Sequence, residues 1–251
     1  MTPSYRPGHG NAGRAVLVSG GTSGLGLAAA RRLCEEGAAV WVLGSSAASL
    51  AGESATLPLA GAGACDVSDP DAVDAAVGAA VTTMGKLDAV FVNAGIDGQG
   101  VPTMELDAKH FRRVLDVNVV GAFLVARAAA RVLARPGAIV FNASVNALRP
   151  ERAFADYNAS KAAVVSLAKT MAIELSGDGI AVTAICPGYF PTRMTAPYLA
   201  DEGERAELLA QIPAGRLGDP AEVAALVSFL ISHEAAYLTG GVITIDGGRS
   251  A

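Results

Sequence analysis

Short, continuously apolar segments alternate with longer stretches of helical pattern along almost the whole chain. These segments are expected to be strands, and they cover residues 15–19, 39–43, 61–65, 89–93, 138–144, 181–186 and 242–246. Because their apolar residues are continuous rather than alternating, both faces of each strand should be buried, as in a parallel sheet. Strands that alternate with helices indicate a doubly wound α/β fold with right-handed crossovers. The sequence predicts about seven parallel strands flanked by helices.

Capping residues mark where several of the expected helices begin and end. One helix should begin at Ser23 or Gly24 and end near residue 36, with Gly37 as its carboxyl-terminal cap. Asp69-Pro70 and Asp219-Pro220 each place a capping side chain before a first-turn proline. Long helices are also expected over residues 107–133 and 155–175. These capping residues at the expected helix ends support the alternation of strands and helices.

The chain of 251 residues is long enough to form one large domain with its own core. Residues 1–13 are rich in turn formers and lack periodicity, so we expect a flexible N-terminal arm there. No shift in composition and no internal repeat divides the remainder. Residues 14–251 are therefore predicted to be a single domain.

Composition excludes several classes of function. The net charge of −5 disfavours binding to nucleic acid or to an anionic membrane, since either surface attracts a basic patch. The three cysteines are far apart in apolar runs and the three histidines form no cluster, so we expect buried thiols and no metal site. The N-terminal residues do not have the pattern of a signal peptide, and the cytoplasm is the expected location.

A glycine-rich segment joins the first expected strand to the first helix. It reads Ser19-Gly20-Gly21-Thr22-Ser23-Gly24-Leu25-Gly26. A dinucleotide pyrophosphate needs main-chain N–H groups at a helix N-terminus, presented by a turn that no Cβ obstructs. Glycines in this context between a strand and a helix therefore predict a phosphate-binding loop.

The spacing of this loop, Ser-Gly-x-x-x-Gly-x-Gly, resembles that of the short-chain dehydrogenase/reductase family. The resemblance extends from residue 14 to 248 through motifs in the same order, and it is nearest to members like 3-oxoacyl-carrier-protein reductase. Those motifs are Asp66-Val67, Asn93-Ala94-Gly95, Asn118, Ser144, Tyr157-x-x-x-Lys161, Pro187-Gly188 and Asp246-Gly247-Gly248. The resemblance implies a single-domain, Rossmann-like oxidoreductase that transfers hydride between a nicotinamide cofactor and a small carbonyl or alcohol.

Tyr157 and Lys161 stand four residues apart on an expected helix, so their side chains share one face. Reduction of a ketone leaves an alkoxide that must be protonated, and a phenol with a pKa of about 10 needs help to act near neutral pH. We expect the ammonium of Lys161 to lower the pKa of Tyr157. Ser144, at the carboxyl end of a strand, should hydrogen-bond the carbonyl. By resemblance, Asn118 holds a water that links Lys161 to solvent, and Lys161 also binds the ribose.

The end of the second strand bears on the choice of cofactor. An acidic residue there would bind the ribose 2′-hydroxyl of NAD and repel a 2′-phosphate, but this chain has Gly44 followed by Ser45 and Ser46. The arginine that NADP-preferring relatives often carry is also absent. We expect NADP(H) as the favoured cofactor, with NAD(H) as the alternative. The full set of expected cofactor-binding residues is Gly20, Thr22, Ser23, Gly24, Leu25, Gly26, Gly44, Ser45, Ser46, Asp66, Val67, Asn93, Ala94, Gly95, Tyr157, Lys161, Pro187, Gly188, Phe190 and Thr192.

Residues 189–215 form the most irregular stretch, which in the family is a mobile lid over the substrate. The expected substrate-binding residues are Ser144, Asn146, Leu148, Phe154, Tyr189 and Met194, with Arg149 and Tyr198 as further candidates. Their mostly apolar character suggests a carbon-rich carbonyl compound. The sequence does not narrow the substrate further.

Two other functions fit the same fold. A catalytically silent dinucleotide sensor or interaction protein would be expected to lack Tyr157 or Lys161, and this chain has both. A lyase or epimerase that uses the cofactor transiently would be expected to carry a separate substrate domain. The resemblance also implies a homo-oligomer, a tetramer or a dimer, that pairs the long helices.

Overall fold

The computed structural model describes residues 10–251. The strands are β1 (Ala15–Ser19), β2 (Ala39–Gly44), β3 (Gly61–Ala64), β4 (Ala89–Val92), β5 (Gly137–Asn142), β6 (Ile180–Pro187) and β7 (Val242–Ile245). The α-helices are α1 (Gly24–Glu35), α2 (Ala47–Leu50), α3 (Pro70–Met84), α4 (Ala108–Leu115), α5 (Gly121–Val132), α6 (Ala155–Leu175), α7 (Ala196–Ala200), α8 (Glu202–Ala210) and α9 (Pro220–Ile231). Every strand expected from the sequence is present, within two residues at each end.

The strands form one parallel sheet in the order β3-β2-β1-β4-β5-β6-β7. The chain moves outward from β1 to β3, then returns to the other side of β1 and continues to β7. The direction of winding therefore changes between β1 and β4, which are hydrogen-bonded neighbours. Ligands of open α/β sheets bind beyond the carboxyl ends of the strands at such a point. The doubly wound fold is confirmed.

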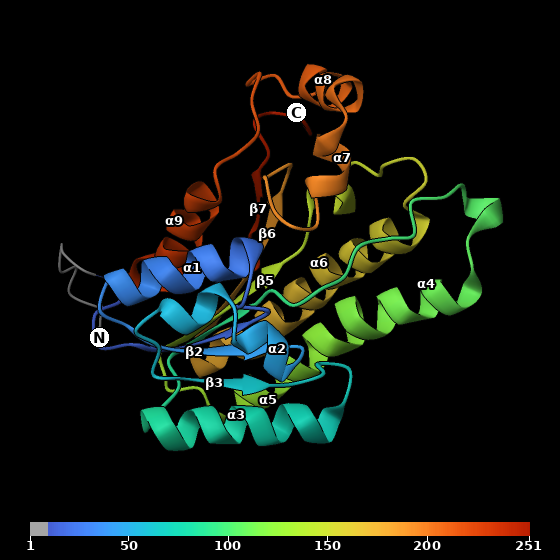
Figure 1. The fold of residues 1–251 in the computed structure, drawn as a ribbon. Coiled ribbons are helices and arrows are strands. Elements are labelled where there is room, and N and C mark those ends of the chain that lie inside the picture. The colour runs from blue at the N-terminus through green and yellow to red at the C-terminus, as the bar shows by residue number, and fades with distance from the viewer. Residues whose placement is uncertain (1–9) are drawn as a thin grey trace.

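Helices cover both faces of the sheet (Figure 1). On one face, α1 and α9 pack against the sheet and each other through residues such as Leu33 and Leu230. On the other face, α3, α5 and α6 cover the larger apolar cluster, which includes Leu17, Phe141 and Val164. Burial on both faces explains why β1, β2, β4, β5 and β6 are continuously apolar. The edge strands β3 and β7 have no fully buried residue, so the expected burial of each strand is wrong for these two.

The predicted capping residues act as expected. The Asp69 carboxylate accepts hydrogen bonds from the main chain at the start of α3, and Gly85 ends that helix with a φ of 75°. Asp219 and Glu222 form a reciprocal capping box at the start of α9. These interactions are local in the sequence and stabilise the helix ends without any tertiary contact.

The helix expected over residues 107–133 is interrupted. It consists of α4, a π-helical turn at Asp116–Val120, and α5. Asn118 lies within this turn and is buried. The side chain of Asn118 bonds to the loop after β4 and to α6, so the wider turn accompanies a tertiary contact that periodicity does not reveal.

The expected flexible arm needs a correction at its carboxyl-terminal end. Residues 1–9 lie outside the described residues. Asn11, however, is buried, and its side-chain amide donates to Glu36 Oε2 at 2.7 Å and to the carbonyl oxygen of Ser228 at 3.0 Å. Residues 10–13 are therefore part of the body, held between α1 and α9.

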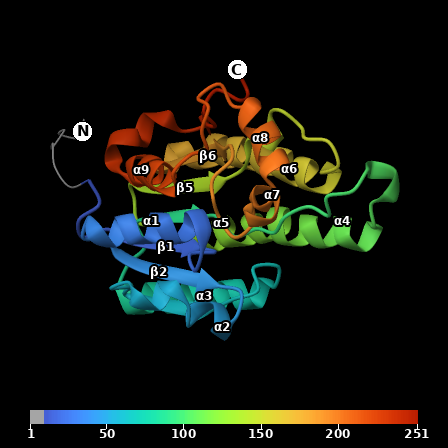
Figure 2. The ribbon, with the colours of Figure 1, turned by 45° about the horizontal axis from the view of Figure 1, so that its top comes forward.

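The segment after β6 forms a separate small unit of α7 and α8. Figure 1 shows this pair in orange at the top of the molecule, apart from the helices that cover the sheet. In the turned view of Figure 2 the C-terminus again lies beside α8. Arg249 Nη2 contacts Gln211 Oε1 at 3.3 Å, just beyond α8. Within residues 10–251, no helix combines the length and apolarity needed to cross a bilayer.

Candidate active site

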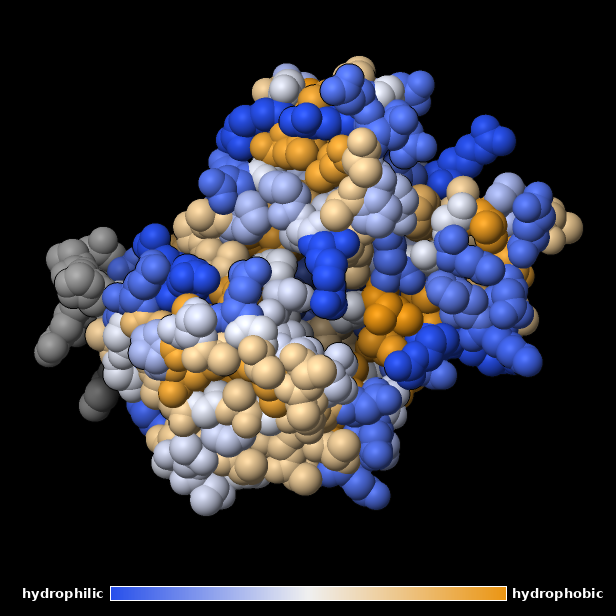
Figure 3. Space-filling view, in the orientation of Figure 1, coloured by the Kyte–Doolittle hydropathy of each residue, from blue (hydrophilic) through white to orange (hydrophobic). Residues whose placement is uncertain are grey.

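A cleft of about 650 Å³ opens beyond the carboxyl ends of the central strands. It extends from the glycine-rich loop after β1 to the side chains of Ser144, Tyr157 and Tyr198. Figure 3 shows hydrophilic side chains around the hollowed centre of this face. The cleft thus lies where the reversal of winding between β1 and β4 predicts a ligand.

Backbone geometry requires glycine in the loop after β1. Gly20 and Gly24 have φ values of 64° and 54°, which side chains rarely tolerate. A Cβ on Gly26 would lie 2.2 Å from the carbonyl oxygen of Gly20. Ser23 precedes α1 without capping it through its side chain, so that side chain leaves the first N–H groups of the helix free to bind an anion.

Ser19 and Asn93 hold this loop against the neighbouring strand. The Ser19 hydroxyl accepts hydrogen bonds from the main-chain N–H groups of Asn93 at 2.9 Å and Ala94 at 3.1 Å. The amide of Asn93 donates to the carbonyl oxygens of Ser19 and Gly20. The side chain of Asn93 is therefore occupied within the protein and fixes the loop after β1 against the end of β4.

The corner after β2 has no room for an acidic side chain at Gly44. A Cβ there would lie 2.5 Å from Ser49 Oγ and 2.8 Å from Thr22 Cγ2. Ser45 is exposed and lines the cleft, whereas the Ser46 hydroxyl accepts the N–H of Ser49 and caps α2. Ser45 and Thr22 are thus the hydroxyls available beside the place that a carboxylate occupies in NAD-binding proteins.

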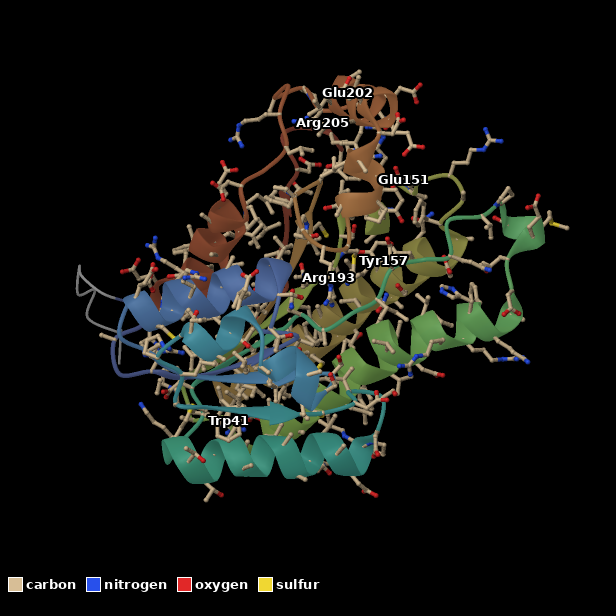
Figure 4. The ribbon with its side chains drawn as sticks, viewed as in Figure 1. Trp41, Glu151, Tyr157, Arg193, Glu202 and Arg205 are labelled. Atoms are coloured by element: carbon tan, nitrogen blue, oxygen red, sulfur yellow. The ribbon has the colours of Figure 1, made fainter. Side chains whose placement is uncertain are left out.

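Tyr157 and Ser144 meet at the inner part of the cleft. Tyr157 belongs to the first turn of α6, and Ser144 follows β5. The Ser144 hydroxyl oxygen accepts the N–H of Asn146 at 3.1 Å, so its own proton remains available to another acceptor. Figure 4 shows Tyr157 with Arg193 beside it and Glu151 above it, on the side of α7.

Lys161 lies one turn further along α6, as its spacing from Tyr157 predicts. Its ammonium nitrogen is 5.5 Å from the centre of the Tyr157 ring and donates to the carbonyl oxygen of Asn142 at 2.8 Å. A Cβ on Gly95 would lie 3.7 Å from Lys161 Nζ and 3.1 Å from Asn118 Oδ1, which places both side chains around Gly95. The helix therefore brings Tyr157 and Lys161 to one wall of the cleft.

Asn118 lies behind this wall rather than in the cleft lining. Its side-chain oxygen accepts the N–H of Ile96 at 2.8 Å, and its amide donates to the Ile96 carbonyl and to Ser160 Oγ. Ser160 in turn donates to the carbonyl oxygen of Tyr157. The side chain of Asn118 is fully engaged in joining the loop after β4 to α6.

The electrostatics of the pair differ from the sequence-based expectation. Burial raises the pKa of Tyr157 above its usual value, and the carboxylates of Asp97 and Glu151 raise it further, while the hydrogen bond from Ser144 opposes them. Burial lowers the pKa of Lys161 to about 8. The expected lowering of the Tyr157 pKa is therefore wrong for the protein alone, because burial and the two carboxylates raise it. The phenol is protonated at neutral pH.

Most of the predicted cofactor-binding residues line this one cleft. They are Gly20, Thr22, Ser23, Gly24, Leu25, Gly44, Ser45, Asp66, Val67, Asn93, Ala94, Gly95, Tyr157, Lys161, Pro187, Gly188, Phe190 and Thr192. Gly26 and Ser46 are not in the lining: Gly26 packs behind the loop against Gly20 and Asn93, and Ser46 caps α2.

Only part of the predicted substrate-binding set lines the cleft. Ser144, Met194 and the further candidate Tyr198 do so, whereas Asn146, Leu148, Arg149, Phe154 and Tyr189 are not in the lining. The Asn146 amide bonds to Glu151 and Asn158, and Leu148 is exposed. Phe154 packs edge-on against Tyr198, and the Tyr189 hydroxyl donates to Glu151. Asn146, Phe154 and Tyr189 thus contact residues of the loops around the cleft, and their part in binding a substrate stays a prediction.

Sequence reasoning missed several residues that line the cleft. Asp97, Arg113, Arg193 and Pro197 all do so, and Tyr198 was named only as a further candidate. A signal for Asp97 was available, because it follows Asn93-Ala94-Gly95 beyond the carboxyl end of β4, where ligands bind. No periodicity marks Arg193, in the irregular stretch between β6 and α7, or Pro197, in the short helix α7.

Comparison with known proteins identifies the family. The family model described as Enoyl-(Acyl carrier protein) reductase matches residues 20–250, which is nearly the whole chain. The chain belongs to the short-chain dehydrogenase/reductase family. This short-chain dehydrogenase/reductase is 40% identical over 237 residues to the 3-oxoacyl-[acyl-carrier-protein] reductase MabA of Mycobacterium bovis, covering 94% of this chain and 92% of the relative. It is 37% identical to the cis-4-hydroxycyclohexanecarboxylate dehydrogenase of Sinomonas cyclohexanicum, covering 97% and 99%.

Solved structures of the family superpose closely. The 3-ketoacyl-(acyl-carrier-protein) reductase from Brucella melitensis, complexed with NADH, gives a TM-score of 0.86 at 33% identity, covering 96% of this chain and 99% of that one. A short chain dehydrogenase from Burkholderia cenocepacia in complex with NADP gives the same TM-score, identity and coverage. This short-chain dehydrogenase/reductase is accordingly an oxidoreductase that acts on alcohol or keto groups, as its relatives' names state for them.

Proposed function

We propose that this protein interconverts a ketone and a secondary alcohol by NAD(P)-dependent hydride transfer, with Tyr157 as the general acid/base. The observation that carries the proposal is that Ser144, Tyr157 and Lys161 line the same cleft as the glycine-rich loop after β1. An acid, a hydrogen-bond donor and a phosphate-binding loop in one cavity are the groups that such a reaction needs.

The residues of the cleft fit a nicotinamide dinucleotide. Gly20, Gly24 and the start of α1 would hold the pyrophosphate, Asp66 and Val67 the adenine, and Thr192 the nicotinamide carboxamide. Gly44 leaves no carboxylate to repel a 2′-phosphate, and Ser45 lies exposed at the same corner. We therefore propose NADP(H) as the favoured cofactor and NAD(H) as the alternative. Relatives crystallised with NADH and with NADP support either choice.

When bound, the nicotinamide supplies the hydride for the carbonyl carbon or accepts it from the alcohol carbon. In the reductive direction, the Ser144 hydroxyl, which bonds to Tyr157 in the cofactor-free protein, would donate to the carbonyl oxygen and so polarise the bond. Tyr157 then gives its phenolic proton to that oxygen as negative charge develops. The raised pKa of Tyr157 means that the phenol carries this proton in the cofactor-free protein. Transfer of the proton would be driven by the higher basicity of the alkoxide that forms on the substrate.

Lys161 and Asn118 would reload the proton on Tyr157. Lys161 has a pKa lowered to about 8, close to the working range of a proton donor near neutral pH, and it would also bind the ribose hydroxyls. A water that relays protons between Lys161 and solvent would bind the main chain of Asn118, since the Asn118 side chain is engaged by Ile96 and Ser160. Asn118 then contributes by shaping the π-helical turn and by holding the loop after β4.

Replacement of the phenolic hydroxyl tests the proposal. Tyr157→Phe should lower kcat with a ketone substrate by a factor of about 100 to 10,000, because general acid catalysis contributes on that scale. Cofactor affinity, measured by NADPH fluorescence, should change less than about threefold, since the ring remains. Tyr237→Phe is the matched control, because Tyr237 is fully exposed and outside the cleft. Full activity in Tyr157→Phe would contradict the proposal.

We also propose a homo-oligomer, a tetramer or a dimer, that pairs the long helices. Ile173 on α6 is 82% exposed, and Phe123 on α5 and Phe229 on α9 are also exposed, so apolar surface is available on those helices. A sedimentation measurement that finds a stable monomer would contradict the oligomer.

The cysteines form no disulfide: Cys65 and Cys186 are buried as expected, while Cys34 is only half-buried. Free thiols agree with the proposed cytoplasmic location.

A further inference from the structure

Asp97 and Tyr198 belong to a part of the cleft that the proposed reaction does not use. Asp97 lies in the loop after β4 and Tyr198 belongs to α7, and both line the cleft together with Tyr157. The Tyr198 hydroxyl donates to Asp97 Oδ2 at 2.7 Å. This hydrogen bond joins α7 to the loop at the carboxyl end of β4, next to the reacting groups.

The Asp97–Tyr198 pair offers hydrogen-bond acceptors to a ligand. Tyr198 uses its only proton on Asp97, so its oxygen can only accept a further bond. Asp97 receives one bond from Tyr198 and one from the N–H of Gly98 at 2.9 Å. A carboxylate has about four acceptor positions, so lone pairs remain for a ligand. The other end of the substrate space has the opposite character, because Ser144 and Tyr157 present protons.

Asp97 is the carboxylate that faces the cleft at the Tyr157 end. Asp156 is fully buried, and its oxygens accept from the N–H groups of Tyr157 and Gln99 and contact the His110 ring. Glu151 lies outside the cleft lining and is engaged by Tyr189. The charge of Asp97 is therefore the negative charge that a substrate would meet there.

Positive charge borders the same space on another side. Arg193 lines the cleft but is exposed to solvent, and Lys161 stands behind Tyr157. An anionic group would be repelled by the half-buried Asp97, and solvent weakens its attraction to the exposed Arg193. A cationic group would be attracted by Asp97 but repelled by Arg193 and Lys161. A neutral hydrogen-bond donor satisfies the Asp97–Tyr198 pair without either repulsion.

We infer that Asp97 and Tyr198 select ketones that carry a hydroxyl group away from the reacting carbonyl and discriminate against ketones with a carboxylate at that place. This inference rests on the proposed function, and it narrows the substrate class to hydroxyketones and the corresponding diols. The carbonyl would bind at Ser144 and Tyr157, and the remote hydroxyl would donate to the Asp97–Tyr198 pair.

A series of ketones on one ring tests the inference. The protein is assayed at pH 8 with NADPH, and with NADH, on cyclohexanone, on 3- and 4-hydroxycyclohexanone and on 4-oxocyclohexanecarboxylate. At least one hydroxyketone should have a kcat/KM about tenfold above that of cyclohexanone, since one hydrogen bond has about that effect. The carboxylate should be the poorest of the series. A carboxylate preference, such as the name of the Sinomonas relative implies for that enzyme, would contradict the inference.

Variants separate Asp97 from a general effect on catalysis. Asp97→Asn keeps the shape of the side chain but removes its charge, so the ratio of kcat/KM for the carboxylate to that for cyclohexanone should rise at least tenfold. Tyr198→Phe should reduce the preference for the hydroxyketone. Each ratio compares kcat/KM for two substrates of the same variant. A change at Tyr157 that affects both substrates equally therefore cancels in the ratio. Asp74→Asn, at an exposed position on α3, is the control and should leave the ratios unchanged.

The outcomes distinguish the two levels of the proposal. Turnover of cyclohexanone with equal kcat/KM across the series, or ratios that Asp97→Asn does not change, would overturn the inference and leave the proposed function intact. Turnover of none of the ketones with either cofactor would contradict the proposed function and with it the inference.

Discussion

The ammonium nitrogen of Lys161 lies 5.5 Å from the centre of the Tyr157 ring, one helical turn away on α6. It donates to the carbonyl oxygen of Asn142 at 2.8 Å, at the end of β5. Both side chains are thus held by the junction of a helix and the sheet, and Lys161 is buried at 4% exposure. Burial of a charged amine without a carboxylate partner has a cost that depends on pH.

Removal of this amine should change how stability depends on pH. The pKa of Lys161 is lowered to about 8 in the folded protein, from 10.5. Between these values the unfolded chain binds a proton that the folded protein does not. The contribution of Lys161 to the free energy of unfolding therefore rises with pH. The contribution is most unfavourable below pH 8, where both states are protonated. Lys161→Met should therefore stabilise the cofactor-free protein at pH 7, and its advantage should shrink by about 2 kcal/mol between pH 8 and 9.5.

Urea unfolding of both proteins across pH 7 to 9.5 measures this difference. The cysteines and the other titrating groups occur in both proteins, so their contributions largely cancel in the comparison. A difference in the free energy of unfolding between the two proteins that stays constant from pH 7 to 9.5 would contradict the lowered pKa of the buried Lys161.

A carboxylate at the corner after β2 should turn the protein away from NADP(H). Ser45 is exposed and lines the cleft, so Ser45→Asp introduces the charge without the collision that Gly44 would suffer. Two unit charges at 4 Å interact by about 4 kcal/mol at an effective dielectric of 20, and exposure reduces this. We expect kcat/KM with NADPH to fall about tenfold or more, with little change for NADH. Ser45→Asn is the uncharged control, and an equal loss in both variants would argue against a 2′-phosphate at this corner.

Two glycine substitutions contrast a required glycine with a dispensable one. In Gly26→Ala the new methyl group would lie 2.2 Å from the Gly20 carbonyl oxygen and 2.4 Å from the Asn93 amide. We expect a loss of several kcal/mol of stability, of the order of an overpacked site, and weakened cofactor binding. Gly78→Ala, in the exposed middle of α3 with no atom within 4 Å of the new Cβ, should stabilise by about 0.5–1 kcal/mol. Thermal unfolding should show a lower Tm for Gly26→Ala and a higher Tm for Gly78→Ala. Equal changes of Tm in the two variants would contradict this prediction.

The amino-acid sequence by itself determined the fold class and most of the cofactor cleft. Continuous apolar strands, capped helices and the glycine-rich loop are local patterns, and each has one simple structural reading. Helical spacing predicted that Tyr157 and Lys161 share one face, and Ser144 stood at a predicted strand end, but their roles in the reaction came from the chemistry of ketone reduction together with the resemblance to the family. Local geometry was sufficient because these residues lie on, or directly after, regular elements.

Only the tertiary structure decided the electrostatics and the outer end of the cleft. Burial raised the pKa of Tyr157 against the expected effect of Lys161, and burial depends on what packs from distant parts of the chain. Asn146 and Tyr189 turned toward Glu151 instead of the cleft, while Asp97 and Tyr198, 101 residues apart, met across it. Such contacts join irregular segments, whose side-chain directions no periodicity fixes. The sequence thus determined where the reaction site lies, and the packing of loops decided which side chains surround the substrate.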